Sequence, residues 1–370
     1  MNPSVVALAC AAALLLSAAP LPAQDADSAA VQAARAHAHA LRDTSGVPGL
    51  SVAVAAGGRV VWAEGLGWAR VEDSVPVTPG TIFGIGSVSK PLVAAALVRM
   101  WERGDIDLDA PAARFVPGIP VGREGMTLRR LAGHLGGVRH YDVRDFTAPP
   151  MPDATPLQRV TRFQLDPLVA QPGTRHSYSS WGYVLLSAAL EAQAGRPFLE
   201  LMAHEVTGPL GLGSTSVDVP GAVPPARAAQ YTGCTPAGCA RAPYADYGGM
   251  WAAGGFTSTA TDLARFGAAL MQPHYLRAEA REAMWTPQRT AAGDDTGYGI
   301  GWRVGRDGDG HRIVHHGGRT RDLRAFLMVY PDEDVVVAVL ANGPADFAET
   351  EVARIAAPFI RARAGSHAQP

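Results

Sequence analysis

The chain has 370 residues, of which 47% are hydrophobic and 18% are charged, and its formal net charge is -2. This composition is that of a globular protein with ample material for a core, arranged as one large domain or two intimate ones. Near-neutral charge without long basic runs argues against nucleic acid or an anionic membrane surface as its main partner.

The first two dozen residues contain an apolar run, VVALACAAALLLSAAP, that is too short to span a bilayer comfortably. Ala23 is a small residue of the kind favoured before signal cleavage. We therefore expect residues 1–23 to be a cleaved signal peptide and the mature protein to be periplasmic or secreted, with an uncleaved anchor as the alternative. Export also suits Cys234 and Cys239, which lie in a Gly/Pro-rich loop and are expected to close a small disulfide.

Secondary-structure signals run from strands at both ends of the mature chain to helices in the middle. An amphipathic helix at 27–43 precedes a β-hairpin in LSVAVAAGGRVVWAEGLG, which turns at Gly57 and Gly58. A second hairpin joins LRAFLMVYP to VVVAVLANG near the C-terminus. Helices are expected at 87–102, 127–133, 182–194, 197–204, in STATDLARFGAALM with its capping-box spacing of Thr259 and Asp262, and at 349–363.

This order of elements predicts an α/β (α+β) fold with one antiparallel sheet made from both chain ends, flanked by helices and interrupted by a large helical insertion. Specifically, we expect 49–67 and 323–342 to pair in the same sheet. The expected sheet domain comprises 24–90 and 250–364, the helical domain 91–249, and a disordered tail 365–370.

Lysine is used only once in this chain. There are 32 basic residues and 31 of them are arginines, which leaves Lys90, three residues after Ser87. In a helix that starts near Ser87, residues three apart share a face, so the hydroxyl and the amine lie within reach. A desolvated lysine can lose its proton and activate a hydroxyl, whereas a guanidinium cannot. Ser87 is thus a candidate nucleophile and Lys90 its activator, with a surface helix cap as the alternative.

Three motifs follow one another in order: Ser87-Val88-Ser89-Lys90, YSSWGY from Tyr178, and HHGG from His315. With the segments LAGHLGGVRHY, AAGGFTSTATDLARF and YGIGW, they resemble the serine β-lactamase, penicillin-binding protein and related esterase superfamily, in the branch similar to class C β-lactamases. GSVSKPL, WERGDIDLD and HLGGVRHY are most similar to the mitochondrial serine β-lactamase-like proteins and their bacterial relatives. The resemblance implies a β-lactamase/transpeptidase-like fold.

The resemblance also implies roles for the motif residues. Ser87 would be the acylated nucleophile, Lys90 the proton acceptor or electrostatic partner, and Tyr178 the phenolic acid/base of deacylation. Because a free phenol has a pKa of about 10, Tyr178 would need a nearby cation such as Lys90 to lower that pKa or to share its proton. A core aromatic at a helix start is the alternative for Tyr178.

The resemblance places HHGG on an edge strand beside the nucleophile. His315 and Gly317 are then expected to contact the substrate, and the N–H of Gly318 to form the oxyanion hole with that of Ser87. Adjacent side chains on a strand point to opposite faces, so only one histidine can face the site. By register we expect this to be His315, with His316 in a structural role.

Two departures from the class C pattern bear on the substrate. Ser180 stands where those enzymes have asparagine and lacks the amide that grips a substrate amide. His315 replaces a lysine and is a weaker anchor for a carboxylate. An esterase or peptidase is therefore expected rather than an efficient β-lactamase. Arg319 and Arg321 are either carboxylate ligands or a solvated strand end.

No metal or cofactor is expected. His134 and His140 are expected to pack a loop near the site rather than bind metal, and His37 and His39 lack further ligands nearby. The sequence also lacks the G-x-S-x-G elbow of α/β-hydrolases. We therefore expect an exported serine hydrolase that acts on a small-molecule or peptide ester or amide. The alternatives are a β-lactamase, a D-alanyl-D-alanine carboxypeptidase, or a non-catalytic acyl-binding or scaffold relative; natural substrate and oligomeric state stay open.

Overall fold

The computed structural model describes residues 23–149, 151, 154–217, 223–235, 238–243 and 249–367. The expected signal peptide therefore lies outside the described residues, apart from Ala23, where the first helix begins. Among the helices of the described ranges, none is long and apolar enough to cross a membrane.

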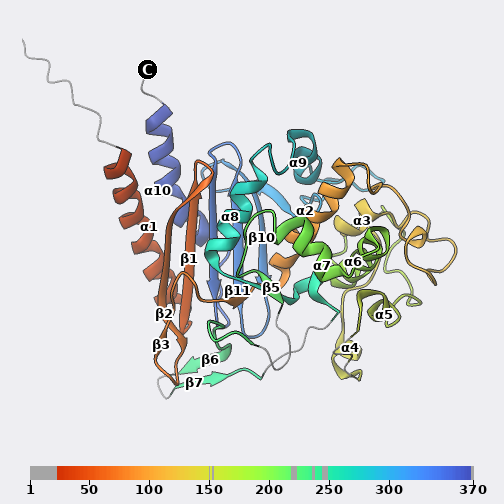
Figure 1. Cartoon of the computed structure of the whole chain (residues 1–370), viewed down its shortest axis with the longest axis horizontal. Coiled ribbons are helices and arrows are strands. Elements are labelled where there is room, and N and C mark those ends of the chain that lie inside the picture. The colour runs from red at the N-terminus through yellow and green to blue at the C-terminus, as the bar shows by residue number, and fades with distance from the viewer. Residues whose placement is uncertain are drawn as a thin grey trace, which may run out of the picture.

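A seven-stranded antiparallel sheet in the order β3-β2-β1-β12-β11-β10-β9 organises the molecule (Figure 1). Its strands are β1 Gly49–Ala56, β2 Arg59–Arg70, β3 Val75–Pro76, β9 Arg303–Arg306, β10 Arg312–Arg319, β11 Arg324–Tyr330 and β12 Val335–Ala341. The N-terminal hairpin β1–β2 joins the C-terminal hairpin β11–β12 through β1 and β12, with Val52 opposite Val339. The prediction that both chain ends build one sheet is confirmed.

Helices from the two chain ends pack together on one face of this sheet. These two helices are α1 (Ala23–Ser45) and α10 (Glu349–His367). A third helix, α8 (Ala260–Leu270), covers the other face of the sheet (Figure 1). The β1 residues divide accordingly: Val52 belongs to the core under α1 and α10, whereas Ala53 belongs to the core under α8. This alternation is the two-residue period of a strand, and it shows that the central strands are buried on both faces.

The helical region lies beyond α8. Its helices and helical turns are η1 Gly86–Val88, α2 Ser89–Glu102, η2 Ala112–Arg114, α3 Leu128–Ala132, α4 Val143–Thr147, α5 Pro156–Val160, α6 Ser180–Ala194, α7 Phe198–Met202, η3 Ala203–Thr207, η4 Trp251–Gly255 and α9 Ala278–Trp285. Most of α2 and α6 is buried, because both are apolar on nearly all sides. α6 ends at Gly195, whose φ of 58° closes the helix in the left-handed conformation, as the sequence predicted.

Several features differ from expectation. The helix predicted at 197–204 ends at Met202 and continues as the π-helical turn η3. The expected tail is helical up to His367, and 368–370 lie outside the described residues. Besides β3 and β9 at the edges of the large sheet, five short strands were not predicted. Three of them pair with segments distant in sequence, and the other two form a local hairpin whose strands are too short for a clear alternation. The five are β4 Phe83–Gly84, β8 Phe256–Ser258 and β5 Ser216–Val217, which form a small sheet, and the hairpin strands β6 Tyr231–Thr235 and β7 Gly238–Arg241.

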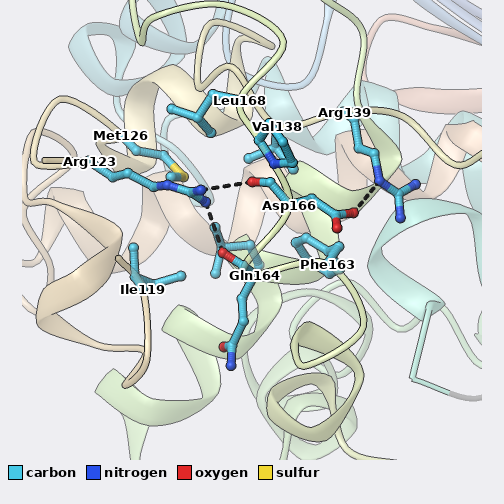
Figure 2. A pocket seen from close by; sticks show the side chains of 11 residues that line it. Ile119, Arg123, Met126, Val138, Arg139, Phe163, Gln164, Asp166 and Leu168 are labelled. Carbon is cyan, nitrogen blue, oxygen red and sulfur yellow. Dashed lines mark hydrogen bonds and ion pairs between the residues drawn. The ribbon is translucent and has the colours of Figure 1, made fainter. Parts of the chain in front are cut away.

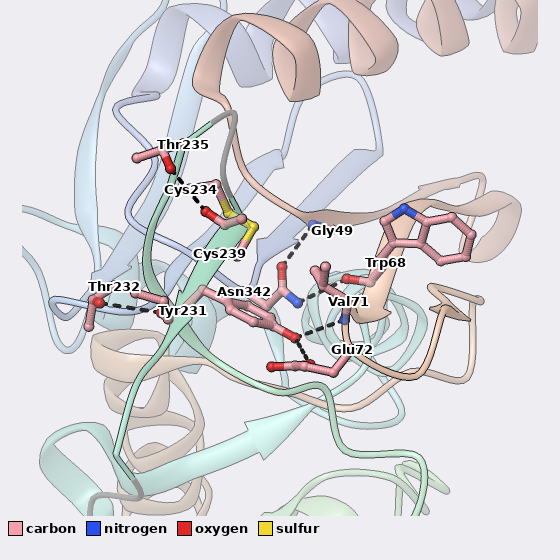
Figure 3. Close-up of a disulfide and its surroundings, with 12 residues drawn as sticks. Gly49, Trp68, Val71, Glu72, Tyr231, Thr232, Cys234, Thr235, Cys239 and Asn342 are labelled. Atoms are coloured by element: carbon pink, nitrogen blue, oxygen red, sulfur yellow. Dashed lines mark hydrogen bonds between the residues drawn. A yellow bond between two sulfur atoms is a disulfide. The ribbon is translucent and has the colours of Figure 1, made fainter.

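The expected disulfide between Cys234 and Cys239 is present and links β6 to β7 (Figure 3). At the base of this hairpin, the hydroxyl of Tyr231 donates to Glu72 at 2.6 Å and accepts the N–H of Val71 at 2.8 Å. The disulfide therefore closes a hairpin that is itself tied to the loop after β2.

Candidate active site

Ser87 lies in the 3-10 turn η1, directly before α2. Gly86 has a φ of 50°, a conformation that favours glycine and lets the chain turn from β4 into η1. The hydroxyl of Ser89 holds the turn, because it donates to the Gly86 carbonyl at 2.7 Å and accepts the N–H of Phe256 at 3.2 Å. Lys90 Nζ lies 3.1 Å from Ser87 Oγ, so the two side chains meet as the spacing predicts.

Lys90 is fully buried, and its amine has three oxygen neighbours. Besides Ser87 Oγ, Nζ contacts the carbonyl oxygen of Ala253 at 2.5 Å and Ser180 Oγ at 3.3 Å. Burial lowers the pKa of Lys90 from 10.5 to about 8. A substantial fraction of this amine is therefore neutral near pH 8 and able to accept a proton.

Tyr178 lies two residues before the start of α6 and beside the amine of Lys90. Its ring centroid is 4.9 Å from Lys90 Nζ. The pKa of Tyr178 is not lowered overall, contrary to the requirement set out from the sequence: burial raises it to about 12, against smaller opposing effects of a hydrogen bond with Ser87 and of the charge of Arg303. The phenol therefore stays protonated at neutral pH, and it is better suited to donate a proton than to act as a free base.

The register assignment of the third motif is wrong by one residue. Along β10, Ile313 lies in the core under α1 and α10, whereas Val314 lies in the core on the α8 side, which also contains α2. His315 accordingly faces α10: its ring stacks on Phe326 at 5.4 Å, and its Nε2 lies 3.2 Å from the Glu349 carboxylate. Strand alternation thus places His315 on the face opposite Ser87 and Lys90.

His316 is the histidine on the site's side of β10. Its Nε2 pairs with the Tyr298 hydroxyl at 3.0 Å, and its Nδ1 with the Gly317 carbonyl at 2.8 Å. Since a carbonyl can only accept, Nδ1 carries the proton and Tyr298 donates to Nε2. Burial, followed by the charge of Lys90, holds the pKa of His316 well below its usual range. His316 is therefore neutral, and both of its nitrogens are engaged inside the protein.

The same one-residue correction applies to the oxyanion donor. The N–H of Thr320 donates to the Leu323 carbonyl, and β10 pairs with β11 in unbroken register. Hydrogen-bonding direction alternates along an antiparallel strand, so the N–H of Gly318 also points toward β11. The N–H of Arg319 points to the opposite edge, and a Cβ on Gly86 would lie 3.3 Å from this nitrogen. Arg319, and not Gly318, presents its amide to η1.

Gly318 matters through the side chain that it lacks. A Cβ at this position would lie 2.0 Å from the Ile85 carbonyl oxygen and 3.2 Å from the Ser87 nitrogen. Gly317 would direct a Cβ toward Phe326, on the His315 face. Gly318 therefore allows β10 to approach η1 closely, which brings the amides of Ser87 and Arg319 to the same side of the site.

Two histidines hold the start of α6. Nδ1 of His134 accepts the N–H of Ser179, and Nδ1 of His140 accepts the N–H of Ser180, each at 3.1 Å. The His134 ring also lies 4.2 Å from that of Tyr178. The expected loop-packing role is confirmed for both. Within the described ranges, no group of three or more His, Cys, Asp or Glu side chains could hold a metal ion.

Arginine contacts secure the loop that carries His140. Arg139 pairs with Asp145 at 2.6 Å. It also pairs with Asp166 at 2.5 Å, and Arg123 donates to the carbonyl oxygens of Gln164 and Asp166 (Figure 2). The pocket drawn there has a volume of only about 10 Å³, and no candidate catalytic side chain lines it. We assign to these arginine contacts a structural role: they hold in place the loop that carries His140.

Two further residues near the site carry no motif signal that would assign them a role from sequence. Tyr298 lies in the YGIGW segment, and Arg303 begins β9. The guanidinium of Arg303 lies 5.9 Å from the centre of the Tyr298 ring, and its charge contributes to lowering the pKa of His316. Arg319 is exposed and pairs with Asp346 at 3.6 Å, which fits a solvated strand end.

Comparison with known proteins agrees with this arrangement. The family model described as beta-lactamase matches residues 34–358. The mitochondrial serine beta-lactamase-like protein LACTB of Mus musculus is 27% identical, over 93% of this chain and 82% of that protein. A D-aminopeptidase of Gluconobacter oxydans is 26% identical, over 80% of this chain and 56% of that protein. The solved octameric penicillin-binding protein homologue of Pyrococcus abyssi has a TM-score of 0.72 and 26% identity, over 84% of this chain and 73% of that chain.

A mixed fold of this kind, with Ser87, Lys90 and Tyr178 brought together beside β10, the strand next to the edge strand β9, defines the serine β-lactamase and penicillin-binding protein superfamily. The chain belongs to the beta-lactamase family.

Proposed function

We propose that this chain is a serine hydrolase that forms an acyl-enzyme on Ser87. The observation that carries the proposal is the 3.1 Å contact between Ser87 Oγ and the Nζ of Lys90, the chain's single lysine, which is fully buried. A neutral amine has two N–H donors and one lone pair. The Ala253 carbonyl can only accept, so it takes one N–H; Ser180 Oγ takes the second, and the lone pair is left for the Ser87 proton.

Acylation follows from these positions. Lys90 takes the proton from Ser87 Oγ as this oxygen attacks the carbonyl carbon of an ester or amide. The negatively charged oxygen of the tetrahedral intermediate accepts hydrogen bonds from the backbone N–H groups of Ser87 and Arg319. As the bond to the leaving group breaks, the protonated Tyr178 donates to it and recovers a proton from Lys90. Water then attacks the carbonyl carbon of the acyl-enzyme while Lys90 takes its proton, and this proton returns to Ser87 Oγ as the bond between Oγ and the acyl carbon breaks.

An ester, amide or peptide substrate is favoured over a β-lactam. The polar side chain two positions after Tyr178 is the short Ser180, and its hydroxyl is occupied by Lys90. The third-motif histidine that faces the site, His316, is neutral and internally bonded, so it offers no charge to a substrate carboxylate. The similarity to a D-aminopeptidase supports a peptide or amide substrate. We propose export to the periplasm or the medium from the residue pattern of 1–23 and from the disulfide.

Intact-protein mass spectrometry after exposure to a panel of acylating probes tests the proposal. Wild type should gain the mass of one acyl group, and Ser87→Ala should not. Labelling of the Ala variant to the same extent would exclude Ser87 as nucleophile. A stable adduct without turnover on any ester, amide or peptide would instead favour an acyl-binding or scaffold role.

A further inference from the structure

His140 lies between the buried site and solvent. Its Nδ1 accepts the N–H of Ser180 at 3.1 Å, and its ring meets that of Tyr178 edge-on at 5.6 Å. Unlike the site residues that it contacts, His140 leaves a large part of its side chain exposed to solvent while the rest is covered by the site. The imidazole thus touches two groups of the site on one side and the surroundings on the other.

The contact with Ser180 fixes the protonation of the His140 ring. Because a backbone N–H donates to Nδ1, this nitrogen keeps its lone pair, and the neutral ring carries its proton on Nε2. Partial burial and the charge of Lys90 lower the pKa of His140 to about 4, with Asp145 acting in the opposite direction. At neutral pH, His140 therefore holds a neutral Nε2–H donor in a fixed orientation.

His134 makes the equivalent contact with the start of α6, but it has no exposed Nε2–H group. Its Nδ1 accepts the N–H of Ser179 at the same 3.1 Å distance, but its side chain is 1% exposed and its Nε2 has no hydrogen-bond partner. The rings of Tyr178 and Tyr298 lie within 4.6 Å of its own, centre to centre. Anchoring of the helix start thus requires only Nδ1, and the two histidines differ in whether the outer nitrogen can meet a ligand.

We infer that His140 is a substrate-positioning residue, whose Nε2–H donates to a carbonyl oxygen on the acyl side of the substrate. An acylamino group next to the reacting carbonyl, as in an N-acyl amino-acid ester or a peptide, supplies such an oxygen. Ser180 is poorly placed for this task, because it is 1% exposed and its hydroxyl contacts Lys90. The inference rests on the proposed acyl-enzyme at Ser87 and names the substrate feature that the site selects.

A pair of esters that differ only in the acylamino group tests the inference. We would measure kcat/KM for p-nitrophenyl propionate and for the p-nitrophenyl ester of N-acetylalanine, in both enantiomers, with wild type, His140→Asn and His140→Ala. Asparagine places an oxygen where Nδ1 was, so it still accepts the N–H of Ser180 but has no Nε2–H. We expect wild type to prefer an acetylalanine ester, and His140→Asn to lose about tenfold on that ester while propionate turnover stays within about threefold. His140→Ala should reduce both, because the helix anchor is also lost.

An equal loss on both esters in His140→Asn, or no loss on either, would reduce His140 to an anchor and overturn the inference. So would a wild type that shows no preference for the acylamino group. Different results would contradict the proposed function itself: hydrolysis of both esters by Ser87→Ala as fast as by wild type, or hydrolysis of neither ester by wild type.

Discussion

The amine of Lys90 and the carbonyl oxygen of Ala253 lie 2.5 Å apart in the interior, and α2 and η4 supply these two groups from distant parts of the chain. Because the carbonyl can only accept, it keeps one N–H of the amine directed away from Ser87. The contact therefore orients the lysine as well as burying it, and orientation and depressed pKa together make Lys90 a proton acceptor.

Replacing Lys90 with arginine distinguishes the contribution of proton transfer to catalysis from the contribution of positive charge. The guanidinium keeps the positive charge but does not deprotonate in proteins, so Lys90→Arg should lose at least about 100-fold in the rate of Ser87 acylation. The release of p-nitrophenol in the first turnover measures this rate, and circular dichroism checks that the fold survives. Acylation near the wild-type rate would mean that the lysine supplies only charge, or that Ser87 is not the nucleophile.

The pH dependence should report Lys90 and not a histidine. Since the neutral amine is the active form and its pKa is about 8, kcat/KM for an ester should rise with pH through about 8 and level off above it. His316 has a pKa well below its usual range and should add no step between pH 6 and 8. Rates between pH 5 and 10 in constant ionic strength provide the test, and a single rise centred near 6.5 would contradict this assignment.

The two adjacent histidines offer a matched pair of variants. His316→Phe keeps the ring but leaves the Tyr298 hydroxyl and the Gly317 carbonyl without their partner, so we expect at least about a tenfold loss in kcat/KM and a lower melting temperature. His315→Phe lies on the α10 face beside Phe326 and should stay within about threefold of wild type. The opposite ranking would restore His315 as the residue that faces the substrate.

Gly318→Ala should be far more damaging than its size suggests. The new Cβ would lie 2.0 Å from the Ile85 carbonyl, which must push β10 away from η1 and separate the amides of Ser87 and Arg319. We expect at least about a 100-fold loss in kcat, as for removal of an oxyanion donor. Gly305→Ala on β9 is the control, because its Cβ meets nothing within 4 Å; comparable losses in the two variants would rule out this explanation.

Substrate class provides the last prediction. The protein should hydrolyse short p-nitrophenyl esters in a Ser87-dependent manner and turn over a chromogenic cephalosporin only slowly, because Ser180 and His316 supply neither an amide grip nor a cation. Each missing charge-assisted contact is worth roughly 1.5 to 3 kcal/mol, so two lower turnover by several powers of ten. Ser180→Asn should recover part of the cephalosporin activity. Efficient cephalosporin turnover by wild type, without ester activity, would show that Ser180 and His316 do not limit β-lactam hydrolysis.

The sequence by itself determined what depends on neighbours along the chain. The three-residue spacing of Ser87 and Lys90 sufficed to bring both onto one face of a helical turn, and the Gly57-Gly58 turn fixed a hairpin through local backbone preference. The disulfide joins cysteines five residues apart. Local geometry decides each of these features, whatever surrounds it.

Only the tertiary structure decided which side of β10 faces the site. Ile313 and Val314 are both apolar, because this strand is buried on both faces, so no polar alternation distinguishes His315 from His316. The direction of the Tyr178 pKa shift likewise depends on how deeply the assembled fold buries the phenol. Tyr298 and Arg303 reach the site from a segment more than 100 residues after Tyr178. These contacts depend on which elements pack together, and the hydrophobic periodicity of one segment does not predict the segment against which it packs.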